Sequence, residues 1–299
     1  MIGEGQRMSL SDSSSVVEAG SGGGNPGDGL THVEGSSSAR IVRMCGVAFH
    51  AVTEPEAIER IVTASRRGNG GRVVTPNLHI LRFCTRDREV RRLVEGADLR
   101  LADGMPVLWA SWVRGTPLPQ RVAGSNLIYS LSEAAADAGL SVFMLGGNPG
   151  MADAASTILC ERYPGLRVVG TSCPPFGFEN DPETHQRVIR EVVDARPDLV
   201  FVGLGCPKQE RLMEQLSQRL PRAWMLGIGF SFSFVAGEAS RAPRWMQKIG
   251  MEWLHRLSKE PRRLTRRYLL EGIPFFAWLL TASVAARVAG KPRGGATVE

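Results

Sequence analysis

The sequence predicts an α/β fold built on a Rossmann-like parallel sheet with helices on both faces. Between residues 140 and 229, short apolar runs alternate regularly with helix-like amphipathic segments. The runs are continuously apolar, which is typical of parallel strands that meet no water. Three runs end in glycine-bearing turns. A smaller N-terminal α/β lobe and a basic helical C-terminal appendage complete the predicted architecture.

The elements follow one another from residue 41 to residue 240, the expected α/β core. It opens with a strand-like run at 41–44, and a capping box from Thr53 to Glu56 begins a helix over 57–64. Later strands are expected at 141–145, 167–170, 199–204 and 223–228, and later helices at 151–162, 182–195 and 208–219.

Composition supports a folded protein that remains in the cell interior. The chain has 299 residues, of which 43% are hydrophobic and 22% charged, and its net charge of +6 identifies no partner. Its five cysteines are widely spaced and contain no Cys-x-x-Cys pair, which argues against a disulfide framework or a zinc site. A reducing cytoplasmic compartment fits this pattern.

Residues 1–40 are predicted to be a disordered tail. They contain 9 Gly and 9 Ser and almost no apolar periodicity, so they cannot bury enough surface to offset the entropy of ordering. They also lack the apolar stretch of a secretory signal, so no export is expected.

The glycine-bearing turns favour a nucleotide-type ligand. Glycine lets a backbone approach phosphate beyond the carboxyl end of a strand, where helix N-termini supply oriented N–H groups. The alternative is that these glycines only make tight turns. The predicted binding residues here are Gly146, Gly147, Gly205 and Gly229. No Gly-x-Gly-x-x-Gly motif, P-loop or Gly-x-Ser-x-Gly elbow occurs, which disfavours a nicotinamide oxidoreductase, a P-loop NTPase and an esterase.

Three upstream motifs carry polar residues at strand ends or helix starts. Thr75 is predicted to be a helix N-cap, with Pro76 at the first helical position. Asp103 follows another strand, and taken alone it is more commonly an N-cap than a base. Arg121 opens a helical stretch that reaches Ala138, and taken alone it is a surface charge.

No metal or cofactor is expected. The five histidines show no metal-binding spacing and no Asp-x-Asp occurs, so arginines and backbone amides would have to bind any phosphate. Asp87 and Glu89 lie in a charged, helix-like and solvated stretch.

The C-terminal part is locally basic. Residues 241–268 hold nine Lys or Arg and two Glu, interleaved with aromatic residues, and an uncharged run at 273–286 follows. That run is shorter than the roughly 20 residues that span a bilayer. A basic aromatic helix of this kind is suited to an anionic membrane surface, and the alternative is a helix packed on the protein. Residues 269–299 are expected to form an apolar segment and a flexible end. Nucleic acid is not an expected partner, since no binding motif occurs.

Taken in order, these motifs resemble the bacterial WecG/TagA/CpsF glycosyltransferase family between Ile41 and Tyr268. The motifs that carry the resemblance are Thr75-Pro-Asn77, Ala102-Asp-Gly104, Arg121-Val-Ala-Gly124, Leu145-Gly-Gly147, Tyr163-Pro164, Gly203-Leu-Gly-Cys-Pro-Lys-Gln-Glu210, Arg241-Ala-Pro243, Glu252-Trp-Leu-His-Arg256 and Glu260-Pro-Arg262.

The resemblance implies a hexosyltransferase that acts with inversion and without a metal. The sugar, of the N-acetylmannosamine type, would pass from a UDP-sugar to a polyprenyl-diphosphate-linked saccharide during synthesis of a cell-surface polysaccharide. The enzyme would be peripheral on the inner, cytoplasmic face of the plasma membrane. By position, Asp103 matches the base and Arg256 matches an appendage arginine that completes the site. The matching pocket residues are Thr75, Asn77, Arg121 and Gln209, with Arg263 and Arg266 in assisting positions.

The side chains at these positions are suited to an inverting glycosyl transfer. A carboxylate such as Asp103 can accept a proton from the acceptor hydroxyl, and Arg121 and Arg256 can meet the charge that develops on the departing diphosphate. One departure is Ser233, which replaces a family aspartate that could hold ribose hydroxyls. The alternative it raises is a catalytically weakened nucleotide-sugar-binding protein at the membrane. The oligomeric state stays open, a homo-oligomer included.

Overall fold

The computed structural model describes residues 40–239, 242–243, 245–246, 250–259 and 261–289, with Arg263 described by its backbone alone. The described residues form one compact unit. The predicted disordered tail lies outside the described residues except for Arg40, and so do Arg241, Arg244 and Lys248 of the basic segment.

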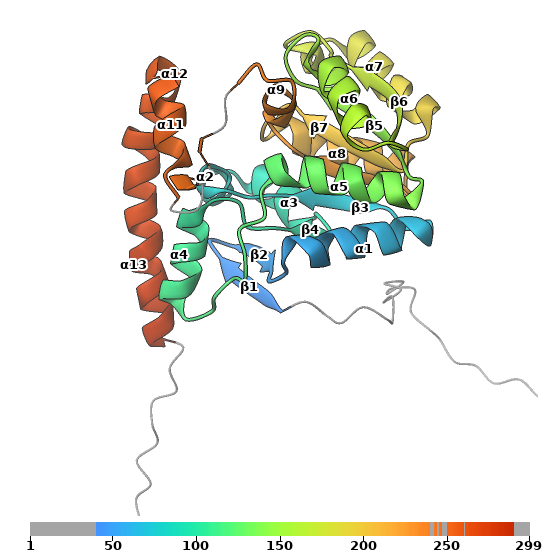
Figure 1. Cartoon of the computed structure of the whole chain (residues 1–299). Helices are drawn as coiled ribbons and strands as arrows, with labels where there is room; N and C mark the ends of the chain where they lie inside the picture. Colours follow the sequence, from blue (N-terminus) through green and yellow to red (C-terminus); the bar gives the residue numbers. More distant parts are fainter. Residues whose placement is uncertain (1–39, 240–241, 244, 247–249, 260, 290–299) are drawn as a thin grey trace, which may run out of the picture. The chain divides into compact units, whose positions relative to one another are not determined.

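A six-stranded parallel sheet with the order β4-β3-β8-β7-β5-β6 forms the centre of the fold, which confirms the predicted architecture (Figure 1). An antiparallel hairpin of β1 and β2 precedes it. The strands are β1 (Ile41–Met44), β2 (Val47–His50), β3 (Gly71–Val74), β4 (Leu99–Arg100), β5 (Ser141–Gly146), β6 (Arg167–Ser172), β7 (Leu199–Gly203) and β8 (Trp224–Gly227). The N-terminal part of the chain therefore supplies both the hairpin and two strands of the main sheet.

Helices cover both faces of this sheet, because side chains of each central strand alternate between two apolar cores. In β5, Val142 and Met144 enter one core, and Phe143 and Leu145 enter the other. The first core contains α1 (Glu54–Arg66), α5 (Gly124–Ala138), α6 (Met151–Arg162) and α9 (Ser231–Val235). The second contains α2 (Leu78–Arg86), α3 (Arg88–Glu95), α7 (Pro182–Ala195) and α8 (Lys208–Arg219).

Local sequence sets the ends of several helices. The predicted capping box begins α1: the Thr53 backbone N–H donates to the Glu56 carboxylate at 2.6 Å, and Thr53 Oγ1 accepts from the Glu56 N–H at 3.5 Å. Asp87 caps α3 by accepting from the N–H groups of Glu89 and Val90. The helices α6, α7 and α8 have the predicted bounds.

Strand pairing brings the motif-bearing turns together. The β5–β7 register runs from Val142 opposite Leu199 to Gly146 opposite Gly203, so the two strands end at the same level. Since β8, β7 and β5 are neighbours in the sheet, their three glycine-bearing turns lie next to one another at its carboxyl edge.

The C-terminal appendage consists of α11 (Glu252–Lys259), α12 (Pro261–Thr265), the π-helix η2 (Arg266–Gly272) and α13 (Ile273–Ala289). The long helix α13 runs beside α4 (Met105–Arg114), as Figure 1 shows, with the rings of Phe276 and Trp109 6.0 Å apart. Leu279 is buried there, whereas Trp278 is half exposed.

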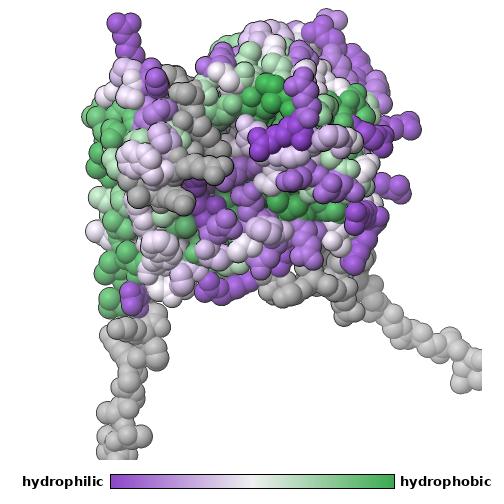
Figure 2. Space-filling view, in the orientation of Figure 1, coloured by the Kyte–Doolittle hydropathy of each residue, from purple (hydrophilic) through white to green (hydrophobic). Residues whose placement is uncertain are grey.

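The apolar C-terminal helix is longer than its uncharged sequence run indicates. Residues Arg266–Ala289 form 24 helical residues, long and apolar enough to cross a membrane by length and composition, and only 11% of the most apolar window is buried. The uncharged run at 273–286 therefore underestimates the length of the helix, because the first turns and the last turn of the helix contain charged residues. Figure 2 shows hydrophobic residues along the outer side of this helix.

Candidate active site

Two cavities lie at the carboxyl edge of the sheet and beneath the appendage. The first, the strand-end cavity, has a volume of about 620 Å³ and is formed by the turns after β3, β5, β7 and β8 together with the loop after β6. The second, the appendage cavity, has a volume of about 450 Å³ and is formed by α2, α4 and the appendage.

The two cavities meet at a shared wall. Its residues come from the turn after β3, the turn after β4 and the appendage, and they line both cavities: Asn77, His79, Asp103, Arg256 and Arg267. The fold thus places the carboxylate of Asp103 and the guanidinium of Arg256, which are 153 positions apart in the printed numbering, at one junction.

The strand-end cavity is suited to an anion. The helices α5, α6 and α8 begin at its rim, and none of the three has a side-chain hydrogen bond at its N-cap. No side chain therefore covers these three N-termini, and the helix dipoles favour negative charge there. The N–H groups of Met151 and Gln209 already donate to the carbonyl oxygens of Asn148 and Gly205, each at 3.0 Å. The predicted residues Gly147, Gly205 and Gly229 line this cavity.

Gln209 holds two of these turns in place. Its side-chain Oε1 accepts from the backbone N–H of Gly205 at 3.2 Å and from that of Gly229 at 3.3 Å. Its Nε2 donates to the buried carboxyl of Glu210 at 2.9 Å, and burial raises the pKa of that carboxyl. A Cβ on Gly227 would lie 2.7 Å from Gln209 Nε2, so a side chain at this position would displace the Gln209 amide. Gln209 lines the cavity and ties the ends of β7 and β8 together.

The Thr75-Pro-Asn77 motif has a different capping residue from the predicted one. Asn77 is the N-cap of α2, and its Oδ1 accepts from the N–H groups of His79 at 3.1 Å and Ile80 at 3.2 Å. The prediction of Thr75 as N-cap is therefore wrong: Asn is at least as good a cap as Thr, and the helix begins at Leu78. Thr75 lines the strand-end cavity instead.

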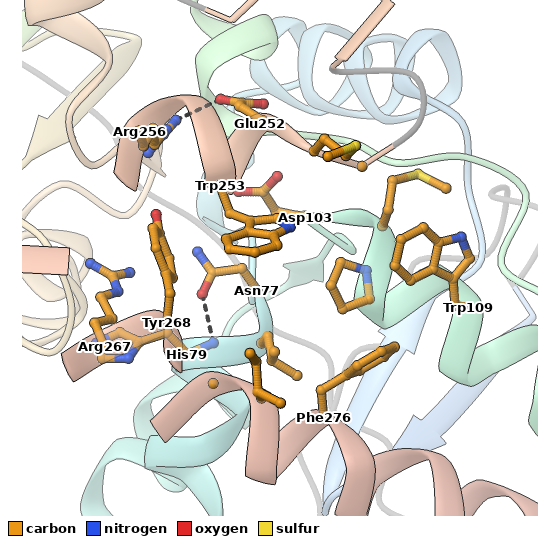
Figure 3. Close-up of a pocket in the computed structure, with 18 of the residues that line it drawn as sticks. Asn77, His79, Asp103, Trp109, Glu252, Trp253, Arg256, Arg267, Tyr268 and Phe276 are labelled. Carbon is orange, nitrogen blue, oxygen red and sulfur yellow. Dashed lines mark hydrogen bonds and ion pairs between the residues drawn. The ribbon is translucent and has the colours of Figure 1, made fainter. Parts of the chain in front are cut away.

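Asp103 does not cap a helix. The N-cap of α4 is Gly104, so the alternative interpretation of Asp103 as an N-cap is wrong. The Asp103 backbone N–H donates to the Pro76 carbonyl at 3.2 Å, which joins the turns after β3 and β4. Its side chain lies close to Trp253 in Figure 3 and lines both cavities.

Glu252 connects the core to the appendage. Its carboxylate accepts from Arg121 Nη1 at 3.0 Å and from Arg256 Nη2 at 2.7 Å. Burial acts to raise the pKa of Glu252, but Arg256 and Arg121 outweigh burial and hold the pKa below its usual value. Burial likewise acts to lower the pKa of Arg256, whereas Glu252 and, more weakly, Tyr268 and Asp103 raise it above its usual value. The local sequence around Glu252 does not indicate this role, because the contact with Arg121 spans 131 positions.

Arg121 has a different environment from the expected one. It lines the appendage cavity, not the strand-end cavity, and its guanidinium is paired with Glu252. Because Arg121 does not line the strand-end cavity, its guanidinium is not placed to meet a diphosphate bound there, whereas Arg256 lines both cavities. Arg121 instead anchors α11 to the core.

His79 is a second site residue that the sequence analysis missed. Its ring packs on Phe83 with 4.4 Å between centroids and lines both cavities. Burial, helped by the charge of Arg267, lowers the pKa of His79 to about 4, so the imidazole is neutral at neutral pH. No spacing motif marks this residue.

Residues 42–289 match the glycosyl transferase WecG/TagA/CpsF family. The chain belongs to this family. It is therefore a glycosyltransferase, and the match continues past Tyr268 to the end of α13, further than the sequence motifs indicate.

Curated relatives of the family include proteins from three Staphylococcus aureus strains, MW2, NCTC 8325 / PS 47 and COL, each named N-acetylglucosaminyldiphosphoundecaprenol N-acetyl-beta-D-mannosaminyltransferase. Each is 30% identical over 249 residues, which cover 82% of this chain and 94% of the relative.

Three of the predicted binding residues, Gly146, Ser233 and Arg266, do not line either cavity. Gly146 packs against β7, where an added Cβ would meet the Gly203 carbonyl oxygen at 2.8 Å. Ser233 is 1% exposed, does not line either cavity, and its Oγ has no hydrogen-bond partner among the described residues. Arg266 pairs with Glu271 at 3.3 Å and is 82% exposed. The side chain of Arg263 lies outside the described residues.

Among the described residues, no group of three or more His, Cys, Asp or Glu side chains is arranged to hold a metal ion. All five cysteines are free thiols.

Proposed function

We propose that this chain is an inverting glycosyltransferase that moves an N-acetylmannosamine-type sugar from UDP to a polyprenyl-diphosphate-linked saccharide. The observation that carries the proposal is the junction of two cavities at Asp103. One cavity has the backbone chemistry of a nucleotide diphosphate site, and the other has the aromatic lining and location of a site for a lipid-linked sugar.

The strand-end cavity takes the donor. Its diphosphate lies against the uncapped N-termini of α5, α6 and α8, with Arg256 at the junction and Lys208 at the first turn of α8. N–H groups and cations placed there stabilise the negative charge that develops on the leaving UDP. These groups support a reaction without a divalent ion.

The appendage cavity takes the acceptor. Four aromatic side chains line it together with Asp103, and Figure 3 labels all of them: Trp109, Trp253, Tyr268 and Phe276. Aromatic rings supply apolar contact area for sugar faces and for isoprene units. The name of the Staphylococcus relatives, which describes an acceptor linked to diphosphoundecaprenol, supports the same assignment.

The reaction follows from this placement. Asp103 accepts the proton of the acceptor hydroxyl as its oxygen forms a bond to the anomeric carbon of the donor sugar. The bond between that carbon and the β-phosphate oxygen breaks, and its electron pair leaves with UDP. Attack from the appendage cavity on a donor held in the strand-end cavity approaches the face opposite the leaving group, which gives inversion.

The enzyme is proposed to act at the cytoplasmic membrane surface. Half-exposed or exposed apolar side chains continue along the outer side of α13, at Ile273, Trp278, Val284 and Val288, and Trp112 of α4 is half exposed beside it. The exposed arginines Arg262 and Arg266 precede them. Apolar residues with adjacent cations suit the headgroup region of an anionic leaflet.

The test is turnover of a panel of UDP-sugars with a short-chain lipid-diphosphate-linked N-acetylglucosamine acceptor, with and without EDTA. The proposal predicts product from UDP-N-acetylmannosamine, of inverted configuration, at an unchanged rate in EDTA. Donor binding without product would contradict the transferase proposal, and loss of turnover in EDTA would contradict metal independence.

A further inference from the structure

The loop after β6, residues 173–181, is fixed at both ends beside the strand-end cavity. At its start, Cys173 Sγ lies 3.3 Å from the carbonyl oxygen of Gly147, in the turn after β5. Near its end, Phe178 is buried and its ring stacks on His185 of α7, with 5.8 Å between centroids. Pro174 and Pro175 between these anchors have restricted backbone torsions. The loop therefore holds a defined position over the cavity.

Phe176 projects from this fixed loop without apolar cover. Its side chain is fully exposed, at 101% of the reference area, and it lines the strand-end cavity. Exposing a whole phenylalanine forgoes the free energy that its burial would give. The described contact on the ring is the ammonium of Lys208, 4.5 Å from the centroid, and Lys208 also pairs with Glu179 of the same loop. The ring thus has one described contact, and its surface is accessible at the edge of the strand-end cavity.

The position of the loop relative to Asp103 indicates which part of a nucleotide-sugar would reach it. Asp103 lies where the two cavities join, so the reacting sugar belongs at that end. The residues of the loop from Cys173 to Glu179 line only the strand-end cavity. Since the diphosphate lies between sugar and nucleoside, the nucleoside belongs at the end away from Asp103, near this loop.

We propose that Phe176 stacks on the heterocyclic base of the nucleotide donor and thereby determines affinity for the nucleoside part. This inference rests on the proposed function. A flat, apolar and accessible ring is the group on which bases stack in single-strand nucleic-acid sites, where the contact tolerates different bases. Lys208 keeps the ring oriented through the cation–π contact and stays close to the first N–H groups of α8.

Isothermal titration of UDP and of inorganic pyrophosphate into the full chain tests the inference, using wild type, Phe176→Ala and Phe176→Trp. For Phe176→Ala we expect UDP affinity to fall about 5- to 100-fold, the change that loss of one base–aromatic stack produces. Pyrophosphate, which has no base, should bind with unchanged affinity. Phe176→Trp should retain most of the wild-type affinity for UDP.

The outcomes separate this inference from the proposed function. If wild type binds UDP and Phe176→Ala binds it equally well, stacking is refuted and the donor assignment stands. An equal loss of UDP and pyrophosphate affinity would refute stacking too, because the substitution would then act on the diphosphate site. If wild type does not bind UDP, the donor assignment fails and this inference fails with it.

Discussion

Replacing Glu252 by glutamine tests whether the Arg121–Glu252–Arg256 bridge assembles the active site. The carboxylate is 14% exposed and accepts charge-assisted hydrogen bonds of 3.0 Å and 2.7 Å. Each such bond contributes about 1.5–3 kcal/mol, and removing one member of a buried ion pair costs about 3–5 kcal/mol. Glutamine keeps one acceptor oxygen but places an amide donor against a guanidinium.

The cost is expected to appear as undocking of α11 and not as unfolding of the core. No residue of α11 is fully buried, so the bridge supplies a large share of its attachment. A loss of about 3 kcal/mol at the assembled site corresponds to a fall in turnover of about a hundredfold. The assay is turnover of the lipid-linked acceptor combined with hydrogen exchange of residues 252–259.

A matched control is Glu89→Gln, which breaks an exposed bidentate pair with Arg211 at 2.9 Å and 2.8 Å. Exposed pairs contribute less than about 1 kcal/mol, so turnover and exchange in α11 should be unchanged. Turnover of Glu252→Gln within twofold of wild type, with unchanged exchange in α11, would refute the reasoning.

Three further predictions concern stability and membrane binding. Burial, with the charge of Arg100, lowers the pKa of His50 to about 4, so the unfolded chain protonates first and the free energy of unfolding falls as the pH drops from 6.5 to 4. His50→Asn keeps an acceptor for the Arg100 N–H. The free energy of unfolding, measured with urea at pH 7 and pH 4.5, should therefore fall by about 1–2 kcal/mol less in this variant than in wild type. Gln209→Leu leaves two glycine N–H groups without their acceptor and should cost about 1–3 kcal/mol in the same assay; an unchanged midpoint would contradict its positioning role. Trp278→Ser should lower the affinity for phosphatidylglycerol vesicles, measured by co-sedimentation, roughly tenfold but leave turnover of a water-soluble acceptor intact. Vesicle affinity equal to that of wild type would contradict membrane binding by this face of α13.

The parallel sheet and its helices were predictable because the central strands β5 and β7 are continuously apolar and helices such as α7 and α8 have a clear amphipathic period. The glycine turns were predictable as strand ends, and their adjacency follows once β8, β7 and β5 are neighbours. The order of strands was not predictable, since it depends on packing between distant segments. Choosing between Thr75 and Asn77 as the N-cap was beyond the sequence because both side chains have the required oxygen.

The parts of the site that the sequence could not predict depend on long-range contacts. In the sequence, Glu252 is an acidic residue within a basic segment, and its contact with Arg121 forms only in the folded chain. His79 has no motif, and its lowered pKa arises from burial that only the folded chain creates. Ser233 follows the β8 turn in sequence, yet its side chain points into packed protein. Motif position therefore identified the neighbourhood of the site, and packing decided which side chains face it.

The most direct test of the catalytic role of Asp103 is turnover of Asp103→Asn measured together with its affinity for UDP. Asparagine has nearly the same shape but cannot accept the acceptor proton, so we expect turnover to fall about 10²- to 10⁴-fold while UDP affinity stays within about threefold. Turnover close to that of wild type, with UDP bound normally, would contradict the role of Asp103 at the junction of the two cavities.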